Sequence, residues 1–298
     1  MNYQEIIRKT SLKDDRIIVM TAENRAVLRE LPDLLGNRFI DTGITEQTMV
    51  GSAAGLALRG RIPICHALAS FLTLRAFEFI RTDVGIANLP VKLSGFIPGF
   101  LSDGNGPTHQ SLEDISIMRG IPNMEVYAPA DNNDMVEMLP QIWSSNKPSY
   151  LRLMHIESTF KHSKFTLGKA EVIEIGNDIN ILVYGFMFKY ALETTQELKK
   201  LGYSVGLINM RSLKPIDEEC IINLSKNGST LVTIEDHFKT GGLYTILAET
   251  LLNNNMTAKV IPIAMEEKWF KPGRIDEVLD HEGFSTEKIT ERILNKIR

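Results

Sequence analysis

SDGNGPTHQSLED, residues 102–114, is the stretch of this chain that says most about its architecture. Its glycines and proline predict a rigid loop that holds the polar side chains of Asn105 and His109 at fixed positions. Ser111 followed by Asp114 fits a capping box, which predicts a helix that begins just after the histidine. Taken alone, the loop is as compatible with a surface turn as with a functional site.

On both sides of this loop, short apolar runs alternate with helical patterns, which predicts parallel sheets covered by crossover helices. The expected strands are 17–22, 62–69, 91–97, 124–130 and 149–154, and then 179–185, 204–210, 230–236 and 259–264. The expected helices are 24–35, 46–60, 71–88, 111–119 and 132–145, and then one up to Gly202, one from Asp217 and one at 243–253. The polar stretch 155–171 predicts an interdomain linker. We therefore predict an α/β chain of two doubly wound domains, residues 1–157 and 171–298.

Composition excludes several classes of protein. The 298 residues suffice for two domains, each with its own core. A net charge of -4 gives no basic surface for nucleic acid, and no apolar stretch approaches the ~20 residues of a membrane span. Cys65 and Cys220 lie far apart in sequence, which argues against a disulfide framework or a zinc site. We expect a reduced, cytoplasmic protein with neither nucleic acid nor membrane as a partner.

Two further stretches carry regular patterns. In DTGITEQTMVGSAAGLALRG, residues 41–60, Glu46 opens a helix of small residues that another backbone can approach closely. The simplest role of Glu46 is to complement the helix dipole. SFLTLRAF, residues 70–77, repeats three apolar side chains at helical spacing, a pattern that usually belongs to a core: Phe71, Leu74 and Phe77.

Together, the order and spacing of the three stretches resemble the pyrimidine-binding domain of transketolases. That family has Ile-x-Glu before a Gly/Ala-rich helix, then an aromatic stripe that opens with Thr-Phe or Ser-Phe, then Gly-Pro-Thr-His-Gln. The matching segments are Ile44-Thr45-Glu46, Ser70-Phe71 and Gly106-Pro107-Thr108-His109-Gln110, followed by IMRGIPNMEVYAPAD at 117–131. From GFMFKYALETTQELKK (185–200) to TIEDHFKTGGL (233–243), the chain resembles the transketolase C-terminal domain. The resemblance implies a pyrimidine-type thiamine-diphosphate-binding fold followed by that second domain.

One motif of thiamine-diphosphate enzymes is absent from the sequence. These enzymes bind the diphosphate through Mg²⁺, using Gly-Asp-Gly and a later Asn-Asn, and no Gly-Asp-Gly occurs in the 298 residues. The resemblance therefore implies a split enzyme. An N-terminal transketolase-like subunit would hold the diphosphate and Mg²⁺, and this chain would hold the pyrimidine without metal ligands of its own. The expected assembly is an α2β2 heterotetramer.

The resemblance also implies roles for single residues. Glu46 matches the glutamate that hydrogen-bonds the pyrimidine, which requires a protonated carboxyl, a form that burial favours. Phe71 would pack on the pyrimidine, and Leu74 and Phe77 would complete an apolar wall that excludes water. His109 matches a histidine that faces the substrate, where it would transfer a proton or bind sugar hydroxyls. The catalytic candidates are therefore Glu46 and His109.

Three departures from the family pattern bear on the substrate. Asn105 stands where transketolases carry Asp, so a charged acceptor becomes a weaker amide. Ile97-Pro98 replaces an upstream histidine. His155 aligns with the arginine that binds a sugar phosphate, while Arg152, at an odd offset in its strand, should point to the other face. We expect a non-standard sugar (modified, branched, sulfonated or nucleotide-linked), bound by Asn105, His109 and His155.

The predicted activity is transfer of a two-carbon ketol unit between sugars, with thiamine diphosphate as electron sink. One alternative is a related thiamine-dependent enzyme, either like deoxyxylulose-phosphate synthase or like the β-subunit of an oxo-acid dehydrogenase. The other alternative is a non-catalytic scaffold subunit, against which the presence of both Glu46 and His109 speaks.

Two histidine-containing segments receive structural interpretations. Glu235, Asp236 and His237 precede a Gly-Gly turn, and we expect a loop at a subunit or domain interface there rather than a metal site. His66 lies in an apolar strand-like run and is expected to be a buried histidine with its hydrogen bonds satisfied.

Overall fold

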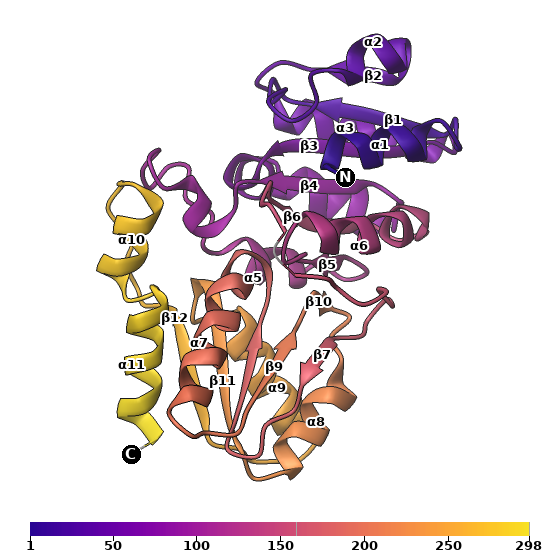
Figure 1. Ribbon diagram of the computed structural model, residues 1–298. Coiled ribbons are helices and arrows are strands. Elements are labelled where there is room, and N and C mark those ends of the chain that lie inside the picture. Colours follow the sequence, from indigo (N-terminus) through magenta and orange to yellow (C-terminus); the bar gives the residue numbers. More distant parts are fainter. Residues whose placement is uncertain (159, 298) are drawn as a thin grey trace. The chain divides into compact units, whose positions relative to one another are not determined.

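The computed structural model describes residues 1–158 and 160–297 and confirms two α/β units (Figure 1). The first unit comprises Met1–Pro98 and Ile117–Leu167. The second comprises Gly99–Ser116 and the chain from Gly168 onward. The domain bounds 1–157 and 171–298 stay a prediction, and the structure adds that the loop 99–116 packs with the second unit.

In the part of the chain that the structure describes, parallel strands of the first unit follow the order β5-β6-β4-β3-β1-β2. These are β1 (Ile17–Thr21), β2 (Phe39–Asp41), β3 (Ile62–Leu68), β4 (Lys92–Phe96), β5 (Glu125–Tyr127) and β6 (Ser149–Leu153). Thr21 pairs with Asp41 on one side and His66 on the other, so β1, β2 and β3 end near one another. The loops after β2 and β3 therefore leave the same edge of the sheet (Figure 1).

The helices of the first unit cover this sheet. They are α1 (Tyr3–Ser11), α2 (Leu31–Leu35), α3 (Glu46–Leu58), α4 (Phe77–Phe79) and α6 (Asn132–Ser144), while α5 (Asp114–Arg119) runs from one unit into the other. Two π-helical segments, η2 (Phe71–Arg75) and η3 (Ile80–Ile86), flank α4, and 3-10 turns form η1 (Gly36–Arg38) and η4 (Gly99–Ser102). None of the described helices has the length and apolar character of a membrane span.

The predicted linker is not a free tether. Phe165 is buried in the core of the first unit, with its ring edge-on to Tyr127 at 5.9 Å. The Gln141 side-chain amide donates a hydrogen bond to the Phe165 carbonyl (2.6 Å), and His162 Nε2 lies 3.2 Å from an Asp131 carboxylate oxygen. Most of this stretch, up to Leu167, therefore belongs to the first unit.

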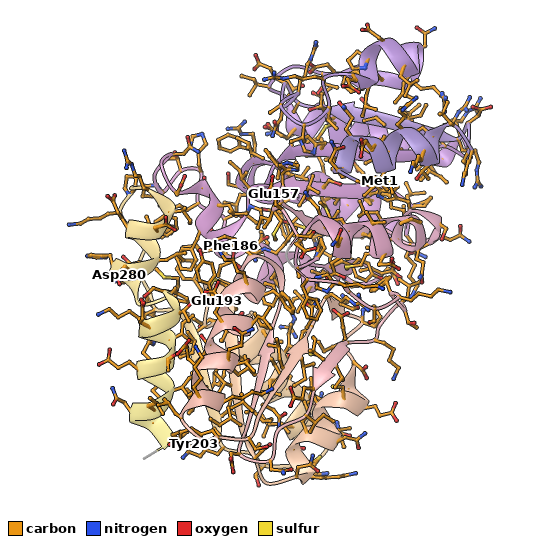
Figure 2. The ribbon with its side chains drawn as sticks, viewed as in Figure 1. Met1, Glu157, Phe186, Glu193, Tyr203 and Asp280 are labelled. Atoms are coloured by element: carbon orange, nitrogen blue, oxygen red, sulfur yellow. The ribbon has the colours of Figure 1, made fainter. Side chains whose placement is uncertain are left out.

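The second unit holds a five-stranded sheet in the order β12-β11-β8-β9-β7, with only β7 antiparallel to its neighbour. Its strands are β7 (Glu171–Glu174), β8 (Ile179–Val183), β9 (Val205–Asn209), β11 (Thr230–Phe238) and β12 (Val260–Met265), and a short β10 (Ser212–Lys214) follows β9. Its helices are α7 (Phe188–Lys200), α8 (Glu218–Lys226), α9 (Leu243–Asn253), α10 (Ile275–Glu282) and α11 (Thr286–Ile297), with a 3-10 turn η5 (Gly185–Met187). Thr286 donates a 2.6 Å hydrogen bond to Glu193 of α7, which is labelled in Figure 2.

Three predicted helices need correction. The helix expected at 111–119 begins at Asp114, because the carbonyls of Ser111 and Leu112 accept hydrogen bonds from the amides of Gly99 and Phe238 instead of from the next helical turn. The helix expected at 24–35 is only α2, which has a proline in its first turn. The helix expected at 71–88 is mostly π-helical.

His66 contradicts one expectation. It is buried between the rings of Tyr3 and Phe96, with centroid distances of 5.6 and 5.4 Å. Among the described residues, neither ring nitrogen has a hydrogen-bond partner, so the prediction of a satisfied histidine is wrong. Burial lowers the pKa of His66 to about 3, and the neutral ring packs as an aromatic side chain.

Candidate active site

Glu46 is the first residue of α3, which follows β2 through a tight loop. The Gly43 amide donates to Asp41 Oδ1 (2.9 Å), and Gly43 itself takes a φ of 69°, a left-handed conformation that favours glycine. The loop therefore turns sharply, and the Glu46 side chain enters the protein with only 2% of its surface exposed. A carboxyl so buried needs a specific partner to compensate its lost hydration.

That partner is Arg75, at the end of the π-helical segment that begins at Phe71. Arg75 Nη1 donates to Glu46 Oε2 over 2.8 Å. The same guanidinium lies over the ring of Phe71, with its central carbon 4.3 Å from the ring centroid. Wide π-helical turns often occur at functional sites. Here the turn lets one flat cation contact two of the four predicted cofactor-binding residues, Glu46 and Phe71.

The stripe of Phe71, Leu74 and Phe77 does not pack into a core. Phe71 and Phe77 are half-buried, and Leu74 is 46% exposed. Further apolar side chains are exposed on neighbouring segments: Ile44, Phe79 and Ile86. These six apolar side chains, here together called the 44–86 surface, are therefore not enclosed in a core.

The loop of the second unit places Asn105 and His109 at the ends of two successive turns. The His109 amide donates to the Gly106 carbonyl (3.0 Å), and Gly106 has a φ of 82°. Thr108 Oγ1 lies 3.0 Å from His109 Nδ1, and the Gln110 side-chain amide donates to the Phe270 carbonyl (2.9 Å). The turn is thus anchored at its end, while Asn105 is exposed and His109 half-buried.

His155 follows β6 and is exposed, whereas Arg152 is fully buried, as the odd offset predicts. His155 lines a pocket of about 310 Å³ in the first unit together with Gln4 and Arg29. Sequence reasoning missed Arg29 and Arg75. Arg75 lies within residues 70–77, but its contacts depend on the π-helical turn, which no sequence pattern predicts.

Glu235, Asp236 and His237 do not form a loop, which corrects the prediction for this segment. They lie buried on β11, next to the start of α9. Glu235 accepts hydrogen bonds from the amides of Leu243 (2.6 Å) and Tyr244 (3.0 Å). Burial raises the pKa of Glu235 to about 8, against the opposing effect of these bonds.

The other two side chains of this segment hold the loop 99–116. His237 Nε2 accepts from the Ser116 amide (3.3 Å). Asp236 packs directly against Gly99, where an added Cβ would stand 1.9 Å from a carboxylate oxygen. The cluster therefore fixes a helix and a loop within the second unit.

Comparison with known proteins agrees with this architecture. Residues 2–158 match the family model of the transketolase pyrimidine-binding domain, and residues 168–289 match that of the transketolase C-terminal domain. The 6-deoxy-6-sulfo-D-fructose transketolase subunit SqwH of Clostridium sp. strain MSTE9 is 33% identical over 96% of this chain and 90% of its own length. A putative transketolase C-terminal section of Methanocaldococcus jannaschii is 32% identical over 99% and 95%.

A solved structure described as a split gene transketolase, inactive β4 tetramer, superposes with a TM-score of 0.88 at 28% identity, covering 98% of this chain and 95% of that one. The 1-deoxy-D-xylulose-5-phosphate synthase of Caldanaerobacter subterraneus is 30% identical over this whole chain, which spans 49% of that enzyme. Both predicted domain folds are thereby confirmed.

Proposed function

This chain belongs to the transketolase family, and we propose that it is the C-terminal subunit of a split transketolase that transfers a two-carbon ketol unit between sugars. The observation that carries the proposal is that a buried carboxyl, Glu46, and a half-buried aromatic ring, Phe71, both contact the flat guanidinium of Arg75; the space that this guanidinium fills is called the gap below. The near full-length match to separately encoded transketolase subunits supports it.

The pyrimidine end of thiamine diphosphate fits this gap. The Arg75 guanidinium, which is flat and carries N–H donors, already bonds to Glu46 and stacks on Phe71. When bound, thiamine diphosphate supplies the electron sink for the carbanion equivalent of the ketol unit. Glu46 would hold a proton on its carboxyl and share it with a pyrimidine ring nitrogen. Phe71 would orient the pyrimidine ring, and the apolar side chains beside it would exclude water. His109 would bind a sugar hydroxyl or exchange a proton with it.

The partner would bind the diphosphate and Mg²⁺. The sequence has no Gly-Asp-Gly segment, and a partner seated on the 44–86 surface would cover its exposed apolar side chains. A related structure built of β chains is described as inactive. These observations support an α2β2 assembly.

Reconstitution tests this proposal. The isolated chain is expected to show no ketol transfer, and activity is expected to appear on mixing with a subunit that carries Gly-Asp-Gly and Asn-Asn, reaching its maximum at a 1:1 ratio. Ketol transfer would be followed by chromatography of the product sugars, with the partner alone as the control. Full activity of the isolated chain would refute the split assignment.

We further propose that the substrate carries an acidic group other than the phosphate of ordinary pentoses. His155 offers a weaker, pH-sensitive donor in place of arginine, Asn105 is uncharged, and one relative is named for a sulfonated sugar. The assembled enzyme is expected to prefer 6-deoxy-6-sulfo-D-fructose to xylulose 5-phosphate by about tenfold or more in kcat/KM. The variant His155→Arg should lower the ratio of kcat/KM for the sulfonated sugar to kcat/KM for xylulose 5-phosphate. Brisk turnover of xylulose 5-phosphate by the unmodified enzyme would overturn the idea.

The main competing function is ligation of a decarboxylated 2-oxo acid, because deoxyxylulose-phosphate synthases match the whole chain. Release of CO₂ from pyruvate by the assembled enzyme distinguishes the two. Sustained CO₂ release that needs an aldehyde acceptor would favour the synthase. Release coupled to an acyl carrier would favour an oxo-acid dehydrogenase.

A further inference from the structure

Arg75 makes two contacts that the proposed function reserves for the cofactor. Its guanidinium donates to Glu46 Oε2 (2.8 Å) and lies 4.3 Å from the centroid of the Phe71 ring. An aminopyrimidine in this gap would share one hydrogen bond with the same carboxyl through a ring nitrogen and would stack on the same ring. Both groups are flat, conjugated and edged with nitrogen, so they are chemically similar occupants of one place.

The two occupants place opposite demands on Glu46. A guanidinium only donates hydrogen bonds, so Glu46 must act as the acceptor beside it. The role proposed for Glu46 requires a proton that the carboxyl can share with a ring nitrogen. The Arg75 contact therefore belongs to the chain before the cofactor binds and opposes the state in which the cofactor works.

We propose that Arg75 is a placeholder, which occupies the pyrimidine position in the cofactor-free chain and swings out when thiamine diphosphate binds. The inference rests on the proposed function of Glu46 and Phe71. The Arg75 side chain is 38% exposed and is held by its ion pair with Glu46 and its contact with the Phe71 ring. Rotation of its own side-chain torsions therefore suffices to carry the guanidinium into water, without a backbone movement.

The ion pair with Arg75 explains how the fold tolerates the buried Glu46 carboxyl in a chain that has bound neither its partner nor the cofactor. Glu46 is 2% exposed, and a buried carboxylate without a counter-charge strongly destabilises a fold. Arg75 supplies the counter-charge until the cofactor replaces it. Arg75 is thus a positioning residue, and it sets the affinity of the site by competing for it.

The variant Arg75→Met tests the proposal, since methionine keeps the apolar stem and removes the cation. The dissociation constant of thiamine diphosphate would be measured by calorimetry on the assembled two-subunit enzyme. The urea midpoint would be measured on the isolated chain. We expect Arg75→Met to bind thiamine diphosphate about fivefold more tightly, because no ion pair or ring contact must be broken. The same variant should lower the urea midpoint of the free chain.

A matched control is Arg81→Met, because Arg81 is exposed on the neighbouring π-helical segment. This variant should change neither the dissociation constant of thiamine diphosphate nor the urea midpoint. Arg75→Lys keeps the charge but loses the flat stacking surface, so its affinity should lie between wild type and Arg75→Met. Weaker cofactor binding by Arg75→Met would overturn the placeholder and make Arg75 a cofactor ligand. Unchanged binding would also overturn it.

Failure of the proposed function has a different signature. If Phe71→Ala and Glu46→Ala leave the affinity for thiamine diphosphate unchanged, the pyrimidine does not bind in this gap at all. If those variants weaken binding while Arg75→Met does not strengthen it, the site stands and only the role of Arg75 is wrong.

Discussion

Replacing Glu46 by glutamine is expected to lower the turnover number of the assembled enzyme by about 10²- to 10⁴-fold. Glutamine has nearly the same shape and can still hydrogen-bond a ring nitrogen, but it cannot exchange a proton with it. The measurement is kcat at saturating substrate and cofactor, with sedimentation to show that the two subunits still associate.

Glu78→Gln is the matched control, because Glu78 is exposed on α4 beside the same aromatic stripe. Its turnover should equal that of the wild type. An unchanged turnover for Glu46→Gln would instead favour the scaffold interpretation, in which this chain holds a catalytic partner without contributing to the chemistry.

The second large effect concerns stability. Replacing Glu235 by alanine should reduce the free energy of unfolding by about 3 kcal/mol or more, because the amides of Leu243 and Tyr244 would lose their buried acceptor at the start of α9. Urea unfolding of the isolated chain measures it. Glu291→Ala, at an exposed position of α11, should change the value by no more than about 0.5 kcal/mol. An equal effect of both variants would contradict the capping role.

The raised pKa of Glu235 also predicts that the free energy of unfolding depends on pH. Its pKa rises from the ordinary 4.5 to about 8 in the folded chain. The folded chain therefore keeps this proton to higher pH than the unfolded chain does. The stabilisation from this group is complete below pH 4.5 and is lost as the pH rises towards 8, by up to a few kcal/mol. Glu235→Gln cannot titrate, so its unfolding free energy should lack this decline. A wild type as stable at pH 8 as at pH 5 would argue against the raised pKa.

The spacing of apolar residues predicts the regular helices and strands correctly. It fails where contacts with distant parts of the chain override the local preference for helix or strand. The strand at 17–22 and the helix at 243–253 were predicted within one residue, because an apolar run flanked by turn residues admits few alternatives. The start of α5 was missed, since the carbonyls of Ser111 and Leu112 are bonded to the amides of Gly99 and Phe238, outside this helix. The strand β11 was predicted two residues too short, because His237 is polar but buried.

For the site, motif spacing located Glu46 and Phe71, and the structure connects the two through Arg75. That connection could not be predicted, because it depends on a widened helical turn whose sequence is ordinary for an α-helix. The same limit applies to Glu235. A carboxylate before a Gly-Gly turn suggested a loop, and only the fold shows that it caps a helix five residues beyond the strand.

The insertion of residues 99–116 into the second unit has an evolutionary consequence. Suppose that recombination replaced all of the chain after the linker. The loop 99–116, with Asn105 and His109, would then pack on a second unit from another protein. Gly99 would face a residue other than Asp236 there. Such hybrids would inherit an intact first sheet and a misfitted substrate loop. The two halves of this gene are therefore expected to descend together, with changes in the loop matched by changes along β11.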